Sequence, residues 1–395
     1  MVMSPHHIVA VLFPAWGHTT SFLCVAMQMM QKDPNLVMTL FQHNIMEAVL
    51  QTCEYDRTRL RVVGFGDKHI PFGPGVIKEA IGQLAGGWME NLPHLVKGST
   101  GWPTPHALHM DFMIGGFVIE HTKRLVDPAC KILAWWSCSL TSLPAHLTDY
   151  DFAAIAREIH SDAARRQDRS LDDILNAVTV AWNGSDSLSG RVVKHPGVPD
   201  ISLFFPVATS ELVKALVDTL LTIESPFPFL FALGGKLASL PQELIQRVNA
   251  SGKGLVCDFW VEQRAILRHG TVGWFLTHGG FNSVSESLSQ GIPLIMWPTT
   301  AEQPVNATLL SSGANPVAFE LVRTGSQLGP SLRSDTIITG TVKDASAEFN
   351  ATFAAVRGPE GARLRVAGNA RQMGKALREA RAGEASEELI RLARF

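Results

Sequence analysis

The sequence has no excess of charge of one sign. Its 34 Lys and Arg residues stand against 36 Asp and Glu residues in a chain of 395, so the formal net charge is -2. Binding to a nucleic-acid backbone or to anionic lipid depends on a basic field that this chain lacks. We therefore expect no nucleic-acid partner. Apolar residues make up 46% of the chain and charged residues 18%, which excludes a disordered protein.

Paired cysteines and long apolar runs are also missing. No stretch approaches the ~18 continuous apolar residues of a membrane span. The first apolar run, Ile8–Phe13, has no Lys or Arg before it, unlike a secretory signal. Scattered cysteines without CxxC spacing argue against a disulfide framework and a zinc site. We expect a cytoplasmic protein with no membrane span. The cysteines are Cys24, Cys53, Cys130, Cys138 and Cys257.

Short apolar runs alternate with amphipathic segments along most of the chain. This is the pattern of parallel strands buried on both faces, each followed by a covering helix, and it predicts an α/β fold. Residues 64–106 are rich in Gly, Pro and His and predict a long irregular excursion. Residues 184–206 combine Gly and Pro with little periodicity and predict a linker. The expected strands span 8–13, 36–41, 131–136, 178–182, 227–232, 254–259, 272–277 and 292–297, and the expected helices span 19–31, 112–125, 212–223, 283–289 and 364–395.

The restart of the pattern after the linker predicts two Rossmann-like domains whose parallel sheets face each other across a cleft. The first domain is expected over residues 1–195 and the second over 200–375. Residues 376–395 are expected to form a helix that packs back across the interface.

The segment WFLTHGGFNSVSESL predicts a strand, a Gly-Gly turn and a helix. Asn282 and Ser283 lie in the first turn of that helix, where unsatisfied backbone N–H groups favour an anion. His278 comes at the end of the strand and faces the same point. Glu286, one turn further along, suits the diol of a ribose, and Trp260 suits stacking on a base.

Each of these residues also has a purely structural explanation. Trp260 fits a core position, Asn282 a helix N-cap and Glu286 a solvated helix face. Strand-Gly-helix phosphate sites are common, and GxGxxG is absent. The local pattern by itself therefore leaves the function open.

The block from Trp260 to Gln303 resembles, without a gap, the signature box of the family 1 glycosyltransferases. These enzymes have the two-domain GT-B fold and use UDP-sugars to glycosylate small lipophilic molecules. The resemblance, which extends to plant secondary-product and microbial glucosyltransferases, implies an acceptor-binding first domain and a UDP-sugar-binding second domain. It implies that uracil stacks on Trp260, the ribose contacts Gln263 and Glu286, the diphosphate contacts His278, Asn282 and Ser283 beside Gly280, and the sugar hydroxyls contact Glu302 and Gln303.

The chain departs from the family at four places. Glu262 stands where plant members have proline, Gly279 where they have cysteine, and Phe281 where they have tryptophan. Upstream, the family usually has Gly followed by Ser or Thr near the phosphates, whereas this chain has FFPVATS over residues 204–210. The last departure leaves one phosphate contact open.

The segment FPAWGHTTSFL resembles the family's first strand and turn, in which the histidine is the general base. His18 opens a helix at the carboxyl end of the first strand, where the helix N-terminus disfavours imidazolium. Asp111 matches the family's anionic partner of that base, although Asp111 also fits a helix N-cap. Glu120 and Asp127 are the alternative anions, and His109 has no fixed negative charge to offer.

Aromatic residues gather in the first half of the chain. Trp88, Phe112 and Trp136 are the candidates for a wall of the acceptor pocket, where flat phenols, flavonoids or terpenoids would pack. Core positions explain each of them equally well.

The sequence thus predicts an inverting, metal-independent UDP-glycosyltransferase that needs no cofactor beyond its UDP-sugar co-substrate. No DxD-type cation site is evident, so the helix N-terminus takes the place of a metal. Gln303 resembles glucosyl-preferring members and favours UDP-glucose. The alternatives are a GT-B epimerase or hydrolase of UDP-sugars and a catalytically silent nucleotide-sugar binder.

Overall fold

The protein is described by a computed structural model in which the chain forms two compact units. One unit holds Met1–Ser137 together with Glu379–Phe395, and the other holds Cys138–Arg378. The division therefore falls between Ser137 and Cys138, upstream of the predicted linker. The residues that the structure describes are 6–68, 76–98, 101–137, 157, 160–161, 192–195, 198–202, 210–224, 227–233, 240–259, 261–298, 302–323, 329–330, 337–358 and 361–394.

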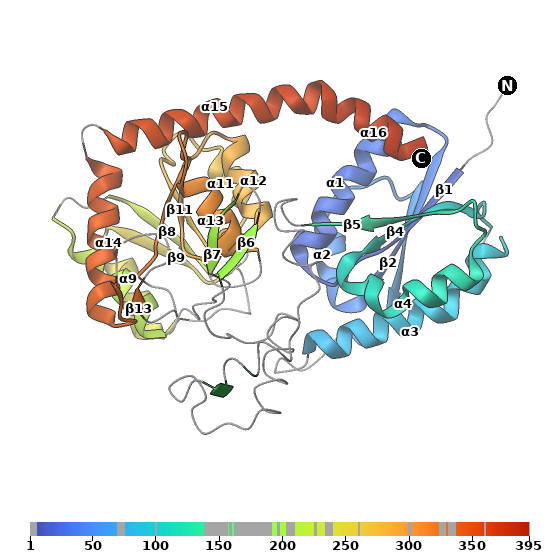
Figure 1. Ribbon diagram of the computed structural model, residues 1–395, viewed down its shortest axis with the longest axis horizontal. Coiled ribbons are helices and arrows are strands. Elements are labelled where there is room, and N and C mark those ends of the chain that lie inside the picture. Colours follow the sequence, from blue (N-terminus) through green and yellow to red (C-terminus); the bar gives the residue numbers. More distant parts are fainter. Residues whose placement is uncertain are drawn as a thin grey trace. The chain divides into compact units, whose positions relative to one another are not determined.

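The first unit is built on a five-stranded parallel sheet with the order β3-β2-β1-β4-β5 (Figure 1). In its centre Val9 of β1 pairs with Thr39 of β2 and with Leu108 of β4. Because the strands are parallel, their carboxyl ends lie along one edge, where functional residues of such sheets gather. The strands are β1 (His6–Val11), β2 (Leu36–His43), β3 (Leu60–Phe65), β4 (Pro105–Asp111) and β5 (Lys131–Trp135).

Helices cover both faces of this sheet, which explains its continuous apolar strands. Alternate residues of β1 point to opposite cores: Ile8 and Ala10 pack with α1 and α16, whereas Val9 and Val11 pack with α3 and α4. Figure 1 shows these two pairs of helices on opposite sides of the sheet. The helices are α1 (Trp16–Lys32), α2 (Glu47–Thr52), α3 (Val76–Val96), α4 (Phe112–Leu125) and α16 (Glu384–Arg394), with a short 3-10 turn at Asn44–Met46.

The prediction of a long irregular excursion over residues 64–106 is wrong, because α3 occupies most of the middle of this segment. Gly82, Gly86 and Gly87 lower the intrinsic helix propensity of the segment, and Pro93 lies inside the helix near its end. Burial of one face overrides that weak propensity. The buried residues of α3 recur at helical spacing: Ile81, Leu84, Ala85, Trp88, Leu92 and Leu95.

The second unit contains short parallel strands. β8 (Phe229–Ala232) pairs with β9 (Gly254–Cys257), and β10 (Phe275–Thr277), β11 (Leu294–Met296) and β12 (Ala318–Glu320) form a three-stranded sheet in that order. Two antiparallel pairs accompany them. These are β6 (Val192–His195) with β7 (Val198–Ser202), inside the predicted linker, and β13 (Gly329–Pro330) with β14 (Ile337–Ile338).

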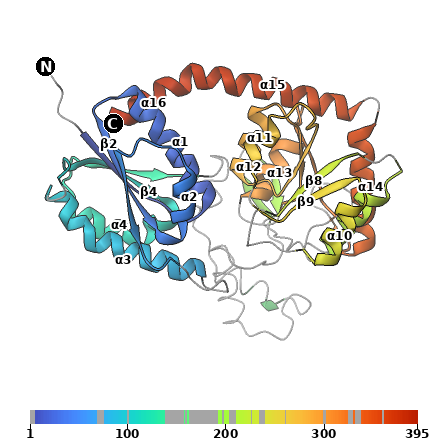
Figure 2. The same cartoon turned by 180° about the vertical axis from the view of Figure 1, so that it is seen from behind.

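Helices also pack on both sides of these strands (Figure 2). Leu294 and Met296 of β11 pack with α12, α13 and α15, while Ile295 between them packs with α9 and α14. The helices are α9 (Ser210–Thr222), α10 (Gln242–Ala250), α11 (Gln263–Leu267), α12 (Phe281–Ser289), α13 (Gln303–Ser311), α14 (Val342–Arg357) and α15 (Ala362–Ala382).

The end of the chain returns to the first unit. Ala393 of α16 is fully buried in the core that α1 lines, and Leu389 and Leu392 pack against the same core. Beside them, His6 Nε2 lies 3.2 Å from the Asp33 carboxylate and Arg394 Nε lies 3.6 Å from it. The expected strand over 178–182 lies outside the described residues. Within the described part of the chain, no helix is both long and apolar enough to cross a membrane.

Candidate active site

His18 lies in the first turn of α1, which begins at Trp16, while β1 ends at Val11. Its Nδ1 lies 2.7 Å from Asp111 Oδ2, and the two side chains are 17% and 0% exposed. An imidazole that donates to a carboxylate through Nδ1 carries its lone pair on Nε2. Parallel pairing of β1 with β4 brings together residues that are 93 positions apart in the chain. The geometry leaves Nε2 able to accept a proton.

Asp111 makes two contacts through its carboxylate. It is the N-cap of α4, and its Oδ1 accepts a hydrogen bond from the Met113 N–H at 3.0 Å. Its Oδ2 is the oxygen next to His18. The alternative anions do not take this place. Glu120 forms an exposed ion pair with Lys123, and Asp127 accepts from the Ala129 N–H.

Ser137 is a neighbour of His18 that sequence reasoning missed. Its Oγ lies 3.0 Å from Nδ1 and 3.2 Å from Nε2, and the residue is 8% exposed. Near-equal distances to both nitrogens place the oxygen over the ring, not in line with one lone pair. Ser137 follows β5 by two residues, so the rule that functional side chains gather at strand carboxyl ends was the available signal.

Two of the three acceptor-wall candidates adjoin the histidine. The Phe112 ring stacks with the His18 ring at a centroid distance of 6.1 Å and contacts the Trp136 ring at 4.2 Å. Phe13, which was not predicted, lies 4.9 Å from the His18 ring. Phe112 and Trp136 are both partly exposed. Flat apolar surface therefore lies beside the base.

The prediction that Trp88 forms a wall of the acceptor pocket is wrong. Its side chain is fully buried, packs edge to face on Phe41 and donates from Nε1 to Thr122 Oγ1 at 2.9 Å. His109 is also a core residue, 2% exposed and packed against Phe22, and burial lowers its pKa to about 4. Sequence alone could not separate these buried residues from site residues, because aromatic and imidazole rings suit both environments.

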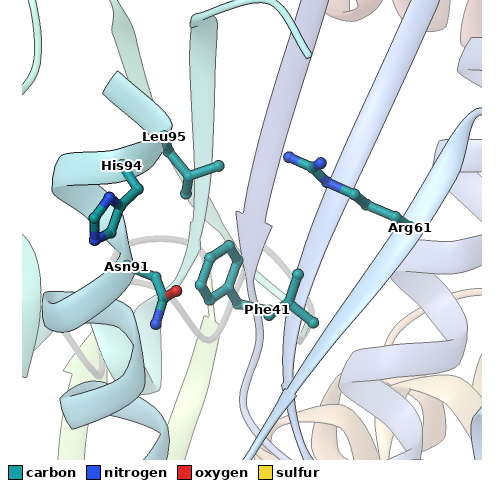
Figure 3. Close-up of a pocket in the computed structure, with 6 residues that line it drawn as sticks. Phe41, Arg61, Asn91, His94 and Leu95 are labelled. Carbon is teal, nitrogen blue, oxygen red and sulfur yellow. The ribbon is translucent and has the colours of Figure 1, made fainter. Parts of the chain in front are cut away.

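A cavity of about 160 Å³ lies beneath α3 (Figure 3). None of the predicted site residues lines it. Its lining residues are Phe41, Arg61, Val63, Asn91, His94 and Leu95.

In the second unit, the two predicted ribose contacts lie together. Gln263 is the first residue of α11, and its Nε2 donates to Glu286 Oε2 of α12 at 2.8 Å. The bond joins side chains that are 23 residues apart. It fixes the Glu286 carboxylate, a group that accepts hydrogen bonds from hydroxyls. Trp260, the predicted uracil platform, lies outside the described residues.

The Gly-Gly turn connects β10 to α12. Gly279 has a φ of 86°, which glycine adopts without strain, and a Cβ on Gly280 would lie 2.5 Å from His278 Nε2. The imidazole therefore lies against the backbone at the start of α12. Surrounding protein lowers the pKa of His278 below its ordinary value, although the residue itself is exposed, and the Glu302 charge acts in the opposite direction. The ring is thus neutral near pH 7 and offers one N–H to a ligand.

The remaining donor candidates surround the same helix start. Asn282 and Ser283 lie in the first turn of α12 and are partly exposed. Glu302 and Gln303, at the start of α13, are only 8% and 6% exposed. Glu302 Oε1 accepts from the Phe281 N–H at 3.1 Å, a contact the sequence did not reveal. The described residues contain no group of His, Cys, Asp or Glu that could hold a metal ion. Of FFPVATS, only Ser210 is described, as the first residue of α9.

Residues 210–334 match the family model described as "UDP-glucoronosyl and UDP-glucosyl transferase". Hydroquinone glucosyltransferase of Rauvolfia serpentina is 47% identical over 77 residues, or 20% of this chain and 16% of that protein. The UDP-glycosyltransferase eriJ of Hericium erinaceus is 32% identical over 175 residues, or 44% of this chain and 34% of that protein. The chain thus matches about a third or less of these relatives' lengths.

The fold similarity extends over the whole chain. The structure of Medicago truncatula UGT71G1 complexed with UDP-glucose superposes with a TM-score of 0.61 at 15% identity, covering 98% of both chains. Its two Rossmann-like domains define the GT-B architecture of this chain. The sequence match covers residues 210–334 of the second unit and the fold similarity covers the whole chain, and both give the UDP-glucuronosyl and UDP-glucosyl transferases as the proteins that this chain is similar to.

Proposed function

We propose that this protein transfers a glucosyl group from UDP-glucose to a hydroxyl of a small lipophilic acceptor, with inversion at the anomeric carbon. The observation that carries the proposal is the bond between His18 Nδ1 and Asp111 Oδ2, which leaves Nε2 to accept a proton. It occurs in a chain whose residues 210–334 match the UDP-glucuronosyl and UDP-glucosyl transferase family model. Apolar rings beside His18 supply the acceptor surface.

In the proposed reaction, His18 Nε2 takes the proton of the acceptor hydroxyl as its oxygen attacks the anomeric carbon. The bond from that carbon to the UDP oxygen breaks in the same displacement, and UDP leaves with the electron pair. Asp111 holds the imidazole and balances the positive charge that forms on it. Backbone N–H groups of α12 and the neutral His278 stabilise the negative charge of UDP.

The proposal includes no metal ion. The N–H groups at the N-terminus of α12 and of His278 stabilise the diphosphate charge. A divalent cation performs this task in metal-dependent transferases. We therefore expect full activity in EDTA. A rate that chelation abolishes and Mg²⁺ or Mn²⁺ restores would contradict this part of the proposal.

The deciding experiment compares His18→Ala with wild type in assays of UDP-glucose with a panel of weakly acidic phenols, quantifying both UDP and glycoside. We expect His18→Ala to lose about 10²-fold or more in transfer rate, as removal of a general base does, while UDP binding persists. His94→Ala is the matched control, because His94 is an exposed residue of α3. Retained turnover in His18→Ala would remove His18 from the mechanism.

The same assay separates the alternatives. Formation of UDP from UDP-glucose without an acceptor indicates a hydrolase. Binding of UDP by a protein that never forms UDP from UDP-glucose indicates a catalytically silent binder. Wild-type kcat/KM with UDP-galactose or UDP-glucuronate above that with UDP-glucose would refute the proposed donor.

A further inference from the structure

The start of α13 is fastened to the turn that begins α12. Glu302 Oε1 accepts from the backbone N–H of Phe281 at 3.1 Å, and Asn306 Nδ2 donates to the Gly279 carbonyl at 2.9 Å. Both side chains are buried, with exposed fractions of 8% and 3%. Phe281 is the first residue of α12, so the Glu302 carboxylate contacts the N-terminus of that helix.

This carboxylate occupies a position suited to a ligand anion. The N-cap of α12 is Gly280, which supplies no side-chain acceptor, so the first N–H groups need an external partner. A negative charge at a helix N-terminus is favourable whether it belongs to a carboxylate or to a phosphate. The Glu302 charge also favours the protonated form of His278, although the net pKa of that residue is lowered, so the charge reaches the imidazole at the same turn. Two negative groups cannot both gain the full benefit of this position.

We propose that Glu302 is an internal competitor of the UDP diphosphate for the N-terminus of α12, and that this competition favours release of the product UDP over release of the donor. The inference rests on the proposed function. When a UDP-sugar binds, Glu302 exchanges the Phe281 N–H for the sugar hydroxyls. Free UDP brings no sugar hydroxyls, so the Glu302 carboxylate stays at the Phe281 N–H and repels the UDP phosphates.

Glu302→Gln tests the inference because it removes the charge and keeps the shape and an oxygen that accepts from the Phe281 N–H. We expect the Kd of UDP to fall about two- to fivefold, the usual effect of one charge at a helix N-terminus. The Kd of UDP-glucose should fall less or rise. Both constants are measured by isothermal titration calorimetry on the full chain. Glu243→Gln, an exposed change of the same charge on α10, should alter neither constant.

Uridine is the internal control. It carries no phosphate, so its affinity should be the same in wild type and Glu302→Gln, and a change would reveal a disturbed fold. Unchanged or weaker UDP binding by Glu302→Gln overturns the inference while the proposed function stands. Equal tightening of UDP and UDP-glucose overturns the exchange with the sugar hydroxyls. Absence of UDP binding by the wild type overturns both the inference and the proposed function.

Discussion

At the scale of single residues, Asp111 divides its carboxylate between two tasks. Oδ1 caps α4 through the Met113 N–H, and Oδ2 binds His18. The charge is needed only for the second task, because a neutral amide oxygen caps a helix as well. One substitution can therefore separate the two tasks.

Asp111→Asn should lower kcat and leave thermal stability and UDP affinity close to wild type. The amide keeps the cap, but it removes the charge that stabilises imidazolium and can hold the wrong imidazole tautomer. The expected loss is on the order of 10²- to 10⁴-fold in kcat. Steady-state kinetics with a phenol of ordinary acidity and a thermal melt make the comparison. An Asn variant with wild-type kcat would leave Asp111 as a cap alone.

Some of the site residues are predictable from the sequence and others are not, for a physical reason. The cap on α4 follows a local rule, so Asp111 was predictable from its immediate neighbours. The role of His18 came from resemblance, and its contact with Asp111 required knowing that β1 pairs with β4. The contact with Ser137 spans 119 residues and depends on β5 lying next to β4, which no local pattern encodes.

At the scale of elements, Trp88 and Trp136 illustrate how one residue type serves two purposes. Trp88 is fully buried between α3, α4 and the sheet, whereas Trp136 follows β5 and is partly exposed beside Phe112. Trp88 follows Gly87 and Trp136 follows Trp135, and neither neighbouring residue marks the ring as buried or exposed. Only the arrangement of the elements distinguishes a core ring from one available to an acceptor.

Trp88→Phe should destabilise the first unit by about 1–3 kcal/mol, because it empties part of the core and leaves Thr122 Oγ1 without its donor. Activity at 20 °C should persist. Trp136→Phe should change stability by less than about 0.5 kcal/mol and shift KM for flat acceptors instead. Urea denaturation and acceptor kinetics on both variants test the contrast, which a KM effect of Trp88→Phe without loss of stability would contradict.

The contact between α12 and α15 requires glycine. A Cβ on Gly374 would lie 2.6 Å from the Leu288 carbonyl oxygen and 2.9 Å from the Gly291 nitrogen. Both are backbone atoms, which can move only together with the rest of the chain around them. A Cβ on Gly368, six residues earlier in α15, would have no neighbouring atom within 4 Å. The two glycines therefore form a natural comparison within one helix.

Gly374→Ala should destabilise the second unit by about 1–3 kcal/mol through overpacking. Gly368→Ala should stabilise it by up to about 1 kcal/mol, because alanine has the higher helix propensity. Thermal melts of the two variants measure these opposite signs. Equal effects of the two substitutions would show that α15 does not press on α12 at Gly374.

At the scale of the whole molecule, buried histidines make stability depend on pH. His7 is fully buried, with Nδ1 2.8 Å from the Pro103 carbonyl and Nε2 2.7 Å from Thr39 Oγ1, and burial lowers its pKa to about 4. The pKa of His109 is lowered to about 4 by the same cause. Both start from an ordinary value of 6.5. Between pH 6.5 and 4, the unfolded chain therefore binds protons that the folded chain refuses.

Stability of the first unit should fall as the pH decreases through 6.5 and continue to fall toward pH 4. Each histidine contributes at most ~1.4 kcal/mol per pH unit in this interval. Urea titrations at pH 7.5, 6 and 5 measure the slope, and His109→Leu should reduce it. A free energy of unfolding that stays constant over this interval would show that the two rings are not held neutral.

The whole-molecule architecture was the most predictable level. Alternating strands and helices encode two α/β units, because parallel strands buried on both faces carry continuous apolar runs, such as Ile8–Val11 of β1. The boundaries were less predictable. The packing of Ala393 into the core beside α1 unites residues from opposite ends of the chain, and composition contains no record of such a pairing.

That return of α16 has a consequence for biosynthesis. The ribosome makes the chain from its N-terminus, so α1 and its sheet emerge long before Glu384–Arg394 exists. All of Cys138–Arg378 must be translated in the interval, while the apolar surface that Leu389, Leu392 and Ala393 will cover stays open. The first part to be synthesised is therefore among the last to be completed.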